Sequence, residues 1–146
     1  MALELPFAAN VFNLKYCTIM QTLKLIFFAG LGGFFGSALR YLTGKLFTHL
    51  THSHFPWGTF VVNLVGSFLI GILFGLAERH QLVSPVANVF LITGFCGGLT
   101  TFSSFADDMY LLLADHRWFQ FALYSSATFL LGLVLVWIGR TIIKGA

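Results

Sequence analysis

The sequence predicts an all-α integral membrane protein whose four helices cross the bilayer. Of the 146 residues, 58% are hydrophobic and only 9% are charged, whereas a soluble domain carries roughly 25% charged residues. The apolar residues form four long stretches, each near the length of about 20 residues that a helix needs to cross the hydrocarbon core. The connections are short, so we expect a single domain. The net charge of +3 is small, and no basic run indicates nucleic-acid binding.

The first expected span covers Leu23–Tyr41. Gly32 and Gly36 within it form a pair of small residues four positions apart, a spacing that lets helix backbones approach closely. The preceding residues do not look like a signal peptide, because no basic region precedes an apolar core. We therefore expect a dispensable N-terminal extension, residues 1–22, and a four-helix transmembrane domain, residues 23–146.

The second span, Thr59–Ala77, has no formal charge but carries a polar stripe. Thr59, Asn63 and Ser67 recur at every fourth position, which puts them on one helical face. A buried asparagine often bonds a neighbouring helix, so the stripe fits a helix–helix contact. The alternative is a polar path, in which the Asn63 amide offers N–H donors.

The third span, Val86–Leu113, contains the stretch "FCGGLTTFSSF", residues 95–105. Gly97 and Gly98 weaken a helix, and the neighbouring hydroxyl side chains compete for backbone hydrogen bonds. Non-helical backbone at membrane depth survives only where protein or a watery cavity covers it, and carbonyl groups freed there suit Na⁺ or water. We expect a broken third helix, with a simple glycine kink as the alternative.

After the break, phenylalanine rings and hydroxyl groups follow neighbouring stripes. Phe102 and Phe105 are three positions apart. Thr101 and Ser104 share that spacing, and Asp108 follows Ser104 by four. The edge of an aromatic ring is electropositive, so ring edges together with hydroxyl or amide donors can replace part of an anion's water shell. No lysine or arginine lies mid-span to trap the anion, and a transport site must also release its ion.

The fourth span, Trp118–Ile138, places Tyr124 and Thr128 four positions apart. Alone, these two are ordinary interhelical hydrogen-bonding residues. Four spans put both chain ends on one side, which holds five of the eight lysine and arginine residues. Because lysine and arginine bias sets orientation, so slight a bias permits insertion both ways up and hence an antiparallel dimer.

Three motifs, in order, resemble the Fluc fluoride channels, also called CrcB: "GGFFGSALRY", "WGTFVVNLVGSFLIG" and "TGFCGGLTTFSSF". The likeness runs from Leu23 to the end of the chain. It implies a channel in the bacterial inner membrane that exports fluoride passively. It also implies an antiparallel, dual-topology homodimer with two pores, and a structural Na⁺ held at the dimer interface by backbone carbonyls of the broken third helices.

The resemblance also implies site residues, position by position. The Na⁺ carbonyls would be those of Gly97 and Thr100, and Arg40 would lie near the pore entrance. The fluoride path would draw on Asn63, Phe102, Phe105, Ser103, Ser104, Tyr124, Thr128 and Asp108.

This chain departs from the family pattern at two positions. The family usually has glutamate where Asp108 stands, and often a small polar residue where Ala106 stands. The polar path here is therefore expected to be shorter or differently hydrated. A carboxylate charge beside the path would repel fluoride, so the Asp108 side chain must be protonated, paired or turned aside.

Other functions fit the sequence less well. A small four-span multidrug exchanger needs a membrane-embedded carboxylate, and the only candidates are Asp107 and Asp108, late in the third span. A scaffold subunit without transport has no use for an aromatic and hydroxyl path. An enzyme is not expected, because the spans contain no Ser/His/Asp set, metal cluster or nucleotide loop. Three loop histidines have metal-like spacing but more often are simply solvated: His49, His52 and His54.

Overall fold

A computed structural model describes the backbone of residues 5–51, 53–80 and 84–145, and the side chains of residues 18–51, 53–78 and 84–145. Every element in these ranges is helical. The elements are α1 (Leu5–Leu50), α2 (Trp57–His80), α3 (Pro85–Asn88), the π-helix η1 (Val89–Cys96), α4 (Gly97–Leu99), α5 (Phe102–Ala114) and α6 (Trp118–Gly145).

Four helical segments are long and apolar enough to cross a membrane, which confirms the predicted all-helical, four-span class. They are Thr18–Leu50, Trp57–Glu78, Pro85–Ala114 and Trp118–Gly145. The first segment continues well past its predicted end at Tyr41. The polar residues there lower the hydropathy without breaking the helix, because hydroxyls bond carbonyl groups one turn back. Thr43 Oγ1 donates to Leu39 O at 2.8 Å, and Thr48 Oγ1 donates to Gly44 O at 2.9 Å.

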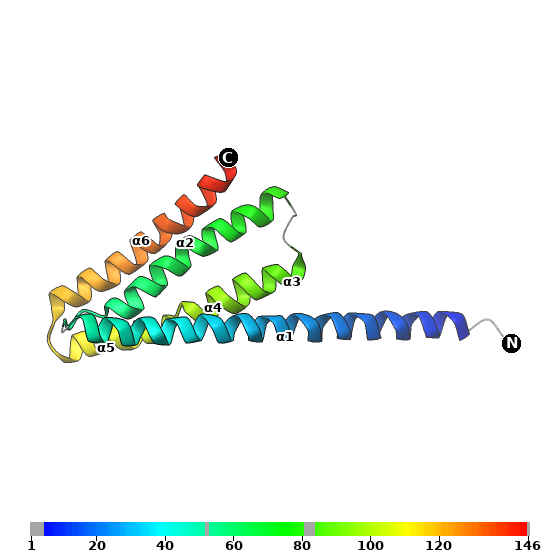
Figure 1. The fold of residues 1–146 in the computed structure, drawn as a ribbon, viewed down its shortest axis with the longest axis horizontal. Coiled ribbons are helices and arrows are strands. Elements are labelled where there is room, and N and C mark those ends of the chain that lie inside the picture. Colours follow the sequence, from blue (N-terminus) through cyan, green and yellow to red (C-terminus); the bar gives the residue numbers. More distant parts are fainter. Residues whose placement is uncertain (1–4, 52, 81–83, 146) are drawn as a thin grey trace.

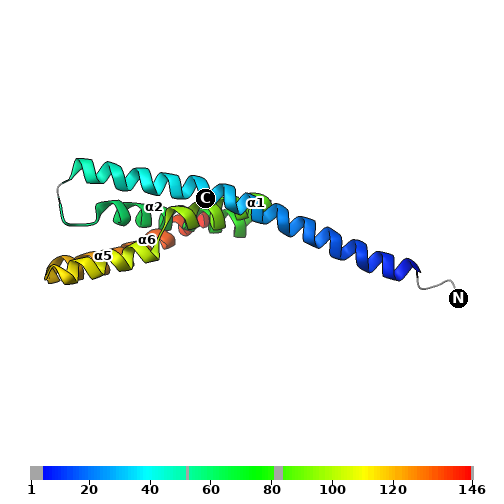
Figure 2. The same cartoon turned by 90° about the horizontal axis from the view of Figure 1, so that it is seen from below.

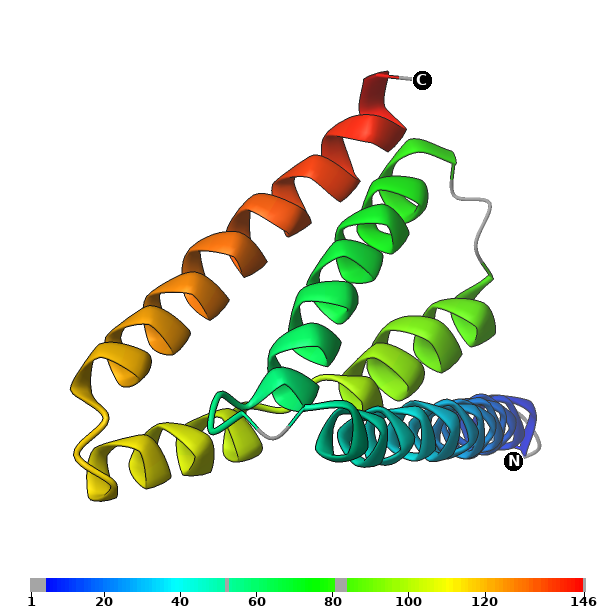
Figure 3. The ribbon, with the colours of Figure 1, turned by 60° about the vertical axis from the view of Figure 1, so that its left-hand side comes forward.

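The helices pack as two close pairs. α2 lies along α6, and α1 lies along η1 and α4 (Figure 1). The N-terminal part of α1 extends beyond the other helices (Figure 2). α5 is separated from α4 by a short non-helical stretch and contacts α6 (Figure 3). The third apolar segment therefore packs along α1 in its first half and contacts α6 in its second half.

Glycines allow the close contact between α1 and the third segment. A Cβ atom on Gly32 or Gly36 would collide with backbone atoms of η1. These two glycines therefore permit the close helix contact that their spacing predicts. Gly98 packs in the same way, since its Cβ would lie 2.6 Å from Gly33 O. Gly97 has helical dihedrals, with φ −63° and ψ −34°. The glycine pair therefore belongs to a helical, closely packed turn, and the chain leaves helical geometry after it.

Few of the described side chains are buried within one chain. The fully buried large ones are Tyr124, Leu99 and Cys96, while many phenylalanine, leucine and tryptophan side chains on all four segments are exposed. Lipid tails are as apolar as these side chains, so a spanning helix has no hydrophobic penalty for exposing them. Polar contacts between helices, such as those of Asn63 with Thr101, therefore fix the centre of the molecule.

Candidate functional site

The site is organised around two extended residues between α4 and α5. Thr100 has φ −80° and ψ 153°, and Thr101 has φ −152° and ψ 119°. Thr101 caps α5, because its Oγ1 accepts a hydrogen bond from Ser104 N at 3.2 Å. This arrangement is the usual N-cap of a helix. In the sequence, Thr101 stands out only as a hydroxyl residue three positions before Ser104, and its role as the cap comes from the structure.

Asn63 on α2 binds the backbone of Thr101 at two points. Its Nδ2 donates to Thr101 O at 3.2 Å, and its Oδ1 accepts from Thr101 N at 2.8 Å. An unsatisfied backbone group in hydrocarbon costs several kcal/mol, so this side chain makes the extended stretch tolerable. The Nδ2 atom carries a second proton, which leaves one donor beyond the backbone pair.

The bond from Thr101 N to Asn63 also affects a carbonyl group one turn back. In a continuous α-helix, Thr101 N would donate to Gly97 O. Thr100 keeps the helical pattern, because its N and its Oγ1 both donate to Cys96 O at 2.9 Å. Gly97 lies at the surface of the single chain. The helix thus loses its hydrogen-bond ladder at the Gly97 carbonyl.

Four predicted path residues line one cavity of about 520 Å³: Asn63, Phe102, Phe105 and Thr128. The Phe102 and Phe105 ring centres are 6.1 Å apart. Phe102 is 78% exposed, whereas Phe105 is half-buried and its ring centre lies 5.1 Å from that of Tyr124. One ring is therefore held in place within the chain, and the other is almost free of contacts.

Asp108 and Tyr124 lie next to this cavity and do not line it. Tyr124 is fully buried, and its hydroxyl donates to Asp108 Oδ2 at 3.0 Å. The Asp108 carboxylate is therefore paired with the Tyr124 hydroxyl, and pairing is one of the three arrangements expected of a carboxylate beside an anion path.

The two serines after the break have different surroundings. The Ser104 hydroxyl accepts from Thr101 Oγ1 at 3.2 Å, and Ser103 Oγ lies 3.1 Å from that same Thr101 oxygen. Ser103 is exposed on the single chain, and Ser104 is half-buried. Thr128 Oγ1 donates to Tyr124 O within its own helix, at 2.6 Å. The hydroxyls of the predicted path thus group around Thr101 and along α6.

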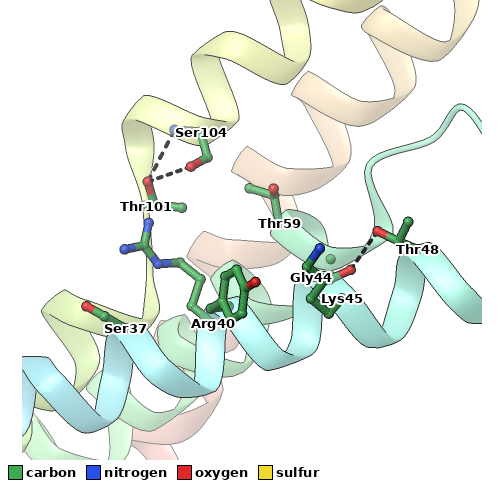
Figure 4. A pocket seen from close by; sticks show the side chains of 10 residues that line it. Ser37, Arg40, Gly44, Lys45, Thr48, Thr59, Thr101 and Ser104 are labelled. Carbon is green, nitrogen blue, oxygen red and sulfur yellow. Dashed lines mark hydrogen bonds between the residues drawn. The ribbon is translucent and has the colours of Figure 1, made fainter.

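A second cavity, of about 500 Å³, lies on the Arg40 side of the break (Figure 4). Arg40 extends from α1 toward Thr101, and Ser104 and Thr59 reach the same space from α5 and α2. Thr101 lines both cavities. Arg40 is predicted at the pore entrance. Its cavity therefore shares Thr101 with the cavity that Phe102 and Phe105 line.

The loop histidines do not form a metal site with described partners. No group of three His, Cys, Asp or Glu side chains within the described ranges could hold a metal ion. His52 lies outside those ranges.

The sequence matches a model of the family described as CrcB-like protein, Camphor Resistance (CrcB), over residues 27–140. That match covers most of the chain. The chain belongs to the CrcB family. The family assignment agrees with the sequence resemblance and leaves residues 1–26 outside the matched region.

Several CrcB relatives carry the name fluoride-specific ion channel FluC. The protein of that name from Flavobacterium psychrophilum is 44% identical over 122 residues, covering 84% of this chain and 98% of the relative. The one from Nitratidesulfovibrio vulgaris strain DP4 is 44% identical over 108 residues, or 74% and 87% of the two chains. The one from Chlorobium luteolum is 44% identical over 114 residues, or 78% and 88%.

Proposed function

We propose that this protein is a fluoride-selective ion channel that lets fluoride leave the cell down its electrochemical gradient, and so lowers cytoplasmic fluoride. The observation that carries the proposal is 44% identity to a fluoride-specific ion channel over 98% of that relative's length. Membership in the CrcB family also argues for a channel over the small multidrug exchanger and over an enzyme.

The site chemistry supports the same function. Fluoride holds its water shell tightly, so a path must supply hydrogen-bond donors and positive ring edges in place of water. The cavity with Asn63, Phe102 and Phe105 offers both, through the second Nδ2 proton and the two rings. The Asp108 carboxylate, bonded to Tyr124, does not line this cavity.

The channel is a homodimer in this proposal, with the two chains antiparallel in the membrane. Phe102 is 78% exposed and Ser103 is exposed, so both have room for contacts from a second chain. The break between α4 and α5 would then be covered by protein, which non-helical backbone at membrane depth requires. The slight charge bias allows both orientations. The location proposed for this multi-pass protein is the bacterial inner membrane.

Backbone carbonyls of Gly97 and Thr100 would hold a Na⁺ ion between the two chains. The residues present fit this ion, because carbonyl oxygens are hard ligands and Thr101 N donates to Asn63 in place of Gly97 O. Gly97 is also exposed, so a partner chain can reach it. A Na⁺ ion held there would offset the negative partial charge of the Gly97 and Thr100 carbonyl oxygens.

The function is tested by measuring anion efflux from liposomes that contain the purified protein. We expect fluoride to leave rapidly and chloride to be retained. Empty liposomes and liposomes with a heat-denatured sample give the background leak. Equal passage of both anions, or of neither, from liposomes with intact protein would overturn the proposal.

A further inference from the structure

A cluster of aromatic rings lies where the loop after α1 meets α2 and α6. Phe55, which belongs to that loop, is in contact with every other ring of the cluster. Its ring centre lies 4.6 Å from that of Trp57, 5.5 Å from that of Phe60 and 5.4 Å from that of Tyr124. Of these rings, Tyr124 alone belongs to the predicted fluoride path. The cluster therefore connects a loop outside the path to a residue beside it.

The backbone of the loop holds Phe55 in place. Ser53 Oγ accepts a hydrogen bond from Phe55 N at 3.1 Å, and Trp57 N donates to Phe55 O at 2.8 Å. Pro56 between them has a fixed φ, and a bond that closes across three residues makes a tight turn. On the α1 side the loop borders a cavity of about 220 Å³. The close ring contacts of Phe55 are therefore on the side of α2 and α6.

Phe55 meets Tyr124 in an edge-to-face arrangement. Their ring planes are 85° apart, whereas Phe60 and Phe105 lie tilted against Tyr124, at 48° and 51°. T-shaped pairs are favourable beyond the area that they bury, because a positive ring edge meets a negative ring face. Together the three phenylalanine rings surround Tyr124, which is fully buried. Phe55 is the one of the three that no helix holds, so the loop helps to fix the Tyr124 ring.

The direction of the Tyr124 ring sets the position of the hydroxyl that binds Asp108. That hydroxyl donates to Asp108 Oδ2 at 3.0 Å. Because the hydroxyl is at the far end of a rigid ring, a small rotation of the ring moves it away from the carboxylate. A carboxylate without this bond can turn toward the cavity that Phe102 and Phe105 line, where its charge repels an anion.

We propose that Phe55 is a positioning residue for fluoride conduction that acts through Tyr124. Its ring edge fixes the Tyr124 ring, so that the hydroxyl keeps the Asp108 carboxylate away from the path. This inference rests on the proposed channel function. Phe55 does not line the cavity that Phe102 and Phe105 line, so its effect on fluoride must pass through a neighbouring side chain.

The test compares Phe55→Leu with Phe47→Leu in the liposome assay. Leucine keeps much of the apolar volume of phenylalanine and removes the ring edge. Phe47 is the matched control, since it is also half-buried and lines the same 220 Å³ cavity. Its ring is not among those that contact Tyr124 within the described ranges. We expect Phe55→Leu to lower fluoride flux about two- to threefold, and Phe47→Leu to match the unchanged channel.

Asp108→Asn separates positioning from a general loosening of the fold. Combined with Phe55→Leu, it removes the charge that Phe55 indirectly holds aside, so flux should return to the level of Asp108→Asn alone. Such non-additivity indicates that the two residues act on one another. A loss that persists in the combined variant would overturn the proposal, and so would an unchanged flux in Phe55→Leu.

A second measurement does not depend on fluoride flux. The chain has three aspartates, Asp107, Asp108 and Asp115, so ¹³C labelling of aspartate carboxyl groups gives few resonances. The resonance that disappears in Asp108→Asn is that of Asp108. In Phe55→Leu this resonance should move toward its position in Tyr124→Phe, and in Phe47→Leu it should stay.

The two measurements also separate this inference from the proposed function. An unmoved Asp108 resonance in Phe55→Leu would overturn the role of Phe55 while leaving a fluoride-selective channel in place. If the unchanged protein fails to prefer fluoride, the proposed function fails, and the Asp108 resonance alone decides whether Phe55 positions the Tyr124 hydroxyl.

Discussion

The side chain of Asn63 forms a closed pair of hydrogen bonds with the backbone of Thr101, at 3.2 Å and 2.8 Å. The pair ties α2 to the only two extended residues between α4 and α5. It also means that the amide which the sequence suggests as a fluoride donor has a structural task of its own. Loss of Asn63 should therefore affect stability as well as transport.

Asn63→Ala is expected to lower the free energy of unfolding by about 2–6 kcal/mol, since it leaves two backbone groups without partners at about 1–3 kcal/mol each. The measurement is the thermal unfolding midpoint of the purified protein in detergent. Ser67→Ala is the matched control. Ser67 lies one turn further along the same helix, and within the described ranges its side chain does not bond the backbone of Thr101. Equal midpoints for the two variants would contradict the structural role of the pair.

Phe102→Leu and Phe105→Leu should separate transport from packing. Both remove a ring edge from the cavity, so fluoride flux should fall about threefold to tenfold, in line with about 0.5–1.5 kcal/mol for an aromatic contact. Phe105→Leu should lower the unfolding midpoint more than Phe102→Leu, because within one chain Phe105 packs on Tyr124 while Phe102 is 78% exposed. Size-exclusion chromatography checks the oligomeric state. Normal fluoride flux in both variants would remove the rings from the path.

Hydropathy predicts the four spans well because the bilayer imposes one length on every apolar helix. It misjudges the end of α1, where Thr43 and Thr48 lower the hydropathy while bonding their own helix. The glycine pair illustrates a second limit. Glycine serves both for unwinding and for close packing, and only the contact of Gly98 with α1 shows that packing is its role here.

The candidate site was predictable as a set of residues and not as a set of contacts. Spacing places Phe102 with Phe105 and Thr59 with Asn63, because both pairs share a helical face. It cannot reveal that Asn63 reaches Thr101, since that bond joins residues 38 positions apart. The π-helical winding of η1 also left no sequence signal that we could identify, and it changes which side chains share a face before the break.

His116 is the one described non-glycine residue with a positive φ, 57°, at the turn between α5 and α6. A side chain in this left-handed region costs about 1 kcal/mol. Here it follows a helix end, a position where glycine is favoured. His116→Gly should raise the unfolding free energy by about 0.5–1 kcal/mol, whereas His116→Ala, which keeps a Cβ atom, should not. Both variants lose the imidazole ring beside Trp118, so their difference isolates the backbone. Equal unfolding midpoints would show that the turn carries no strain.

The N-terminal extension is expected to be dispensable. The CrcB match begins at residue 27. A chain that starts at Met20 keeps every residue around the two cavities. We expect it to insert, to assemble and to pass fluoride at the rate of the full chain in the liposome assay. Loss of both assembly and flux would show that residues 1–19 belong to the functional protein.

Tyr124→Phe tests the pairing of Asp108. The change removes the hydroxyl that donates to Asp108 Oδ2 at 3.0 Å and keeps the ring that packs on Phe105. A carboxylate released from this bond can turn toward the cavity, where its charge repels fluoride. We expect fluoride flux to fall about threefold or more, which corresponds to at least about 0.7 kcal/mol.

Asp108→Asn supplies the control for that prediction, because it removes the charge without changing the size of the side chain. Alone it should keep a substantial part of the fluoride flux, and combined with Tyr124→Phe it should restore flux toward the level of Asp108→Asn alone. Such non-additivity is the mark of two residues in direct contact. If Asp108→Asn abolishes flux while the proposed dimer still assembles, the carboxylate takes part in conduction directly. The hydroxyl of Tyr124 then positions a conducting group instead of keeping a repelling charge away from the path.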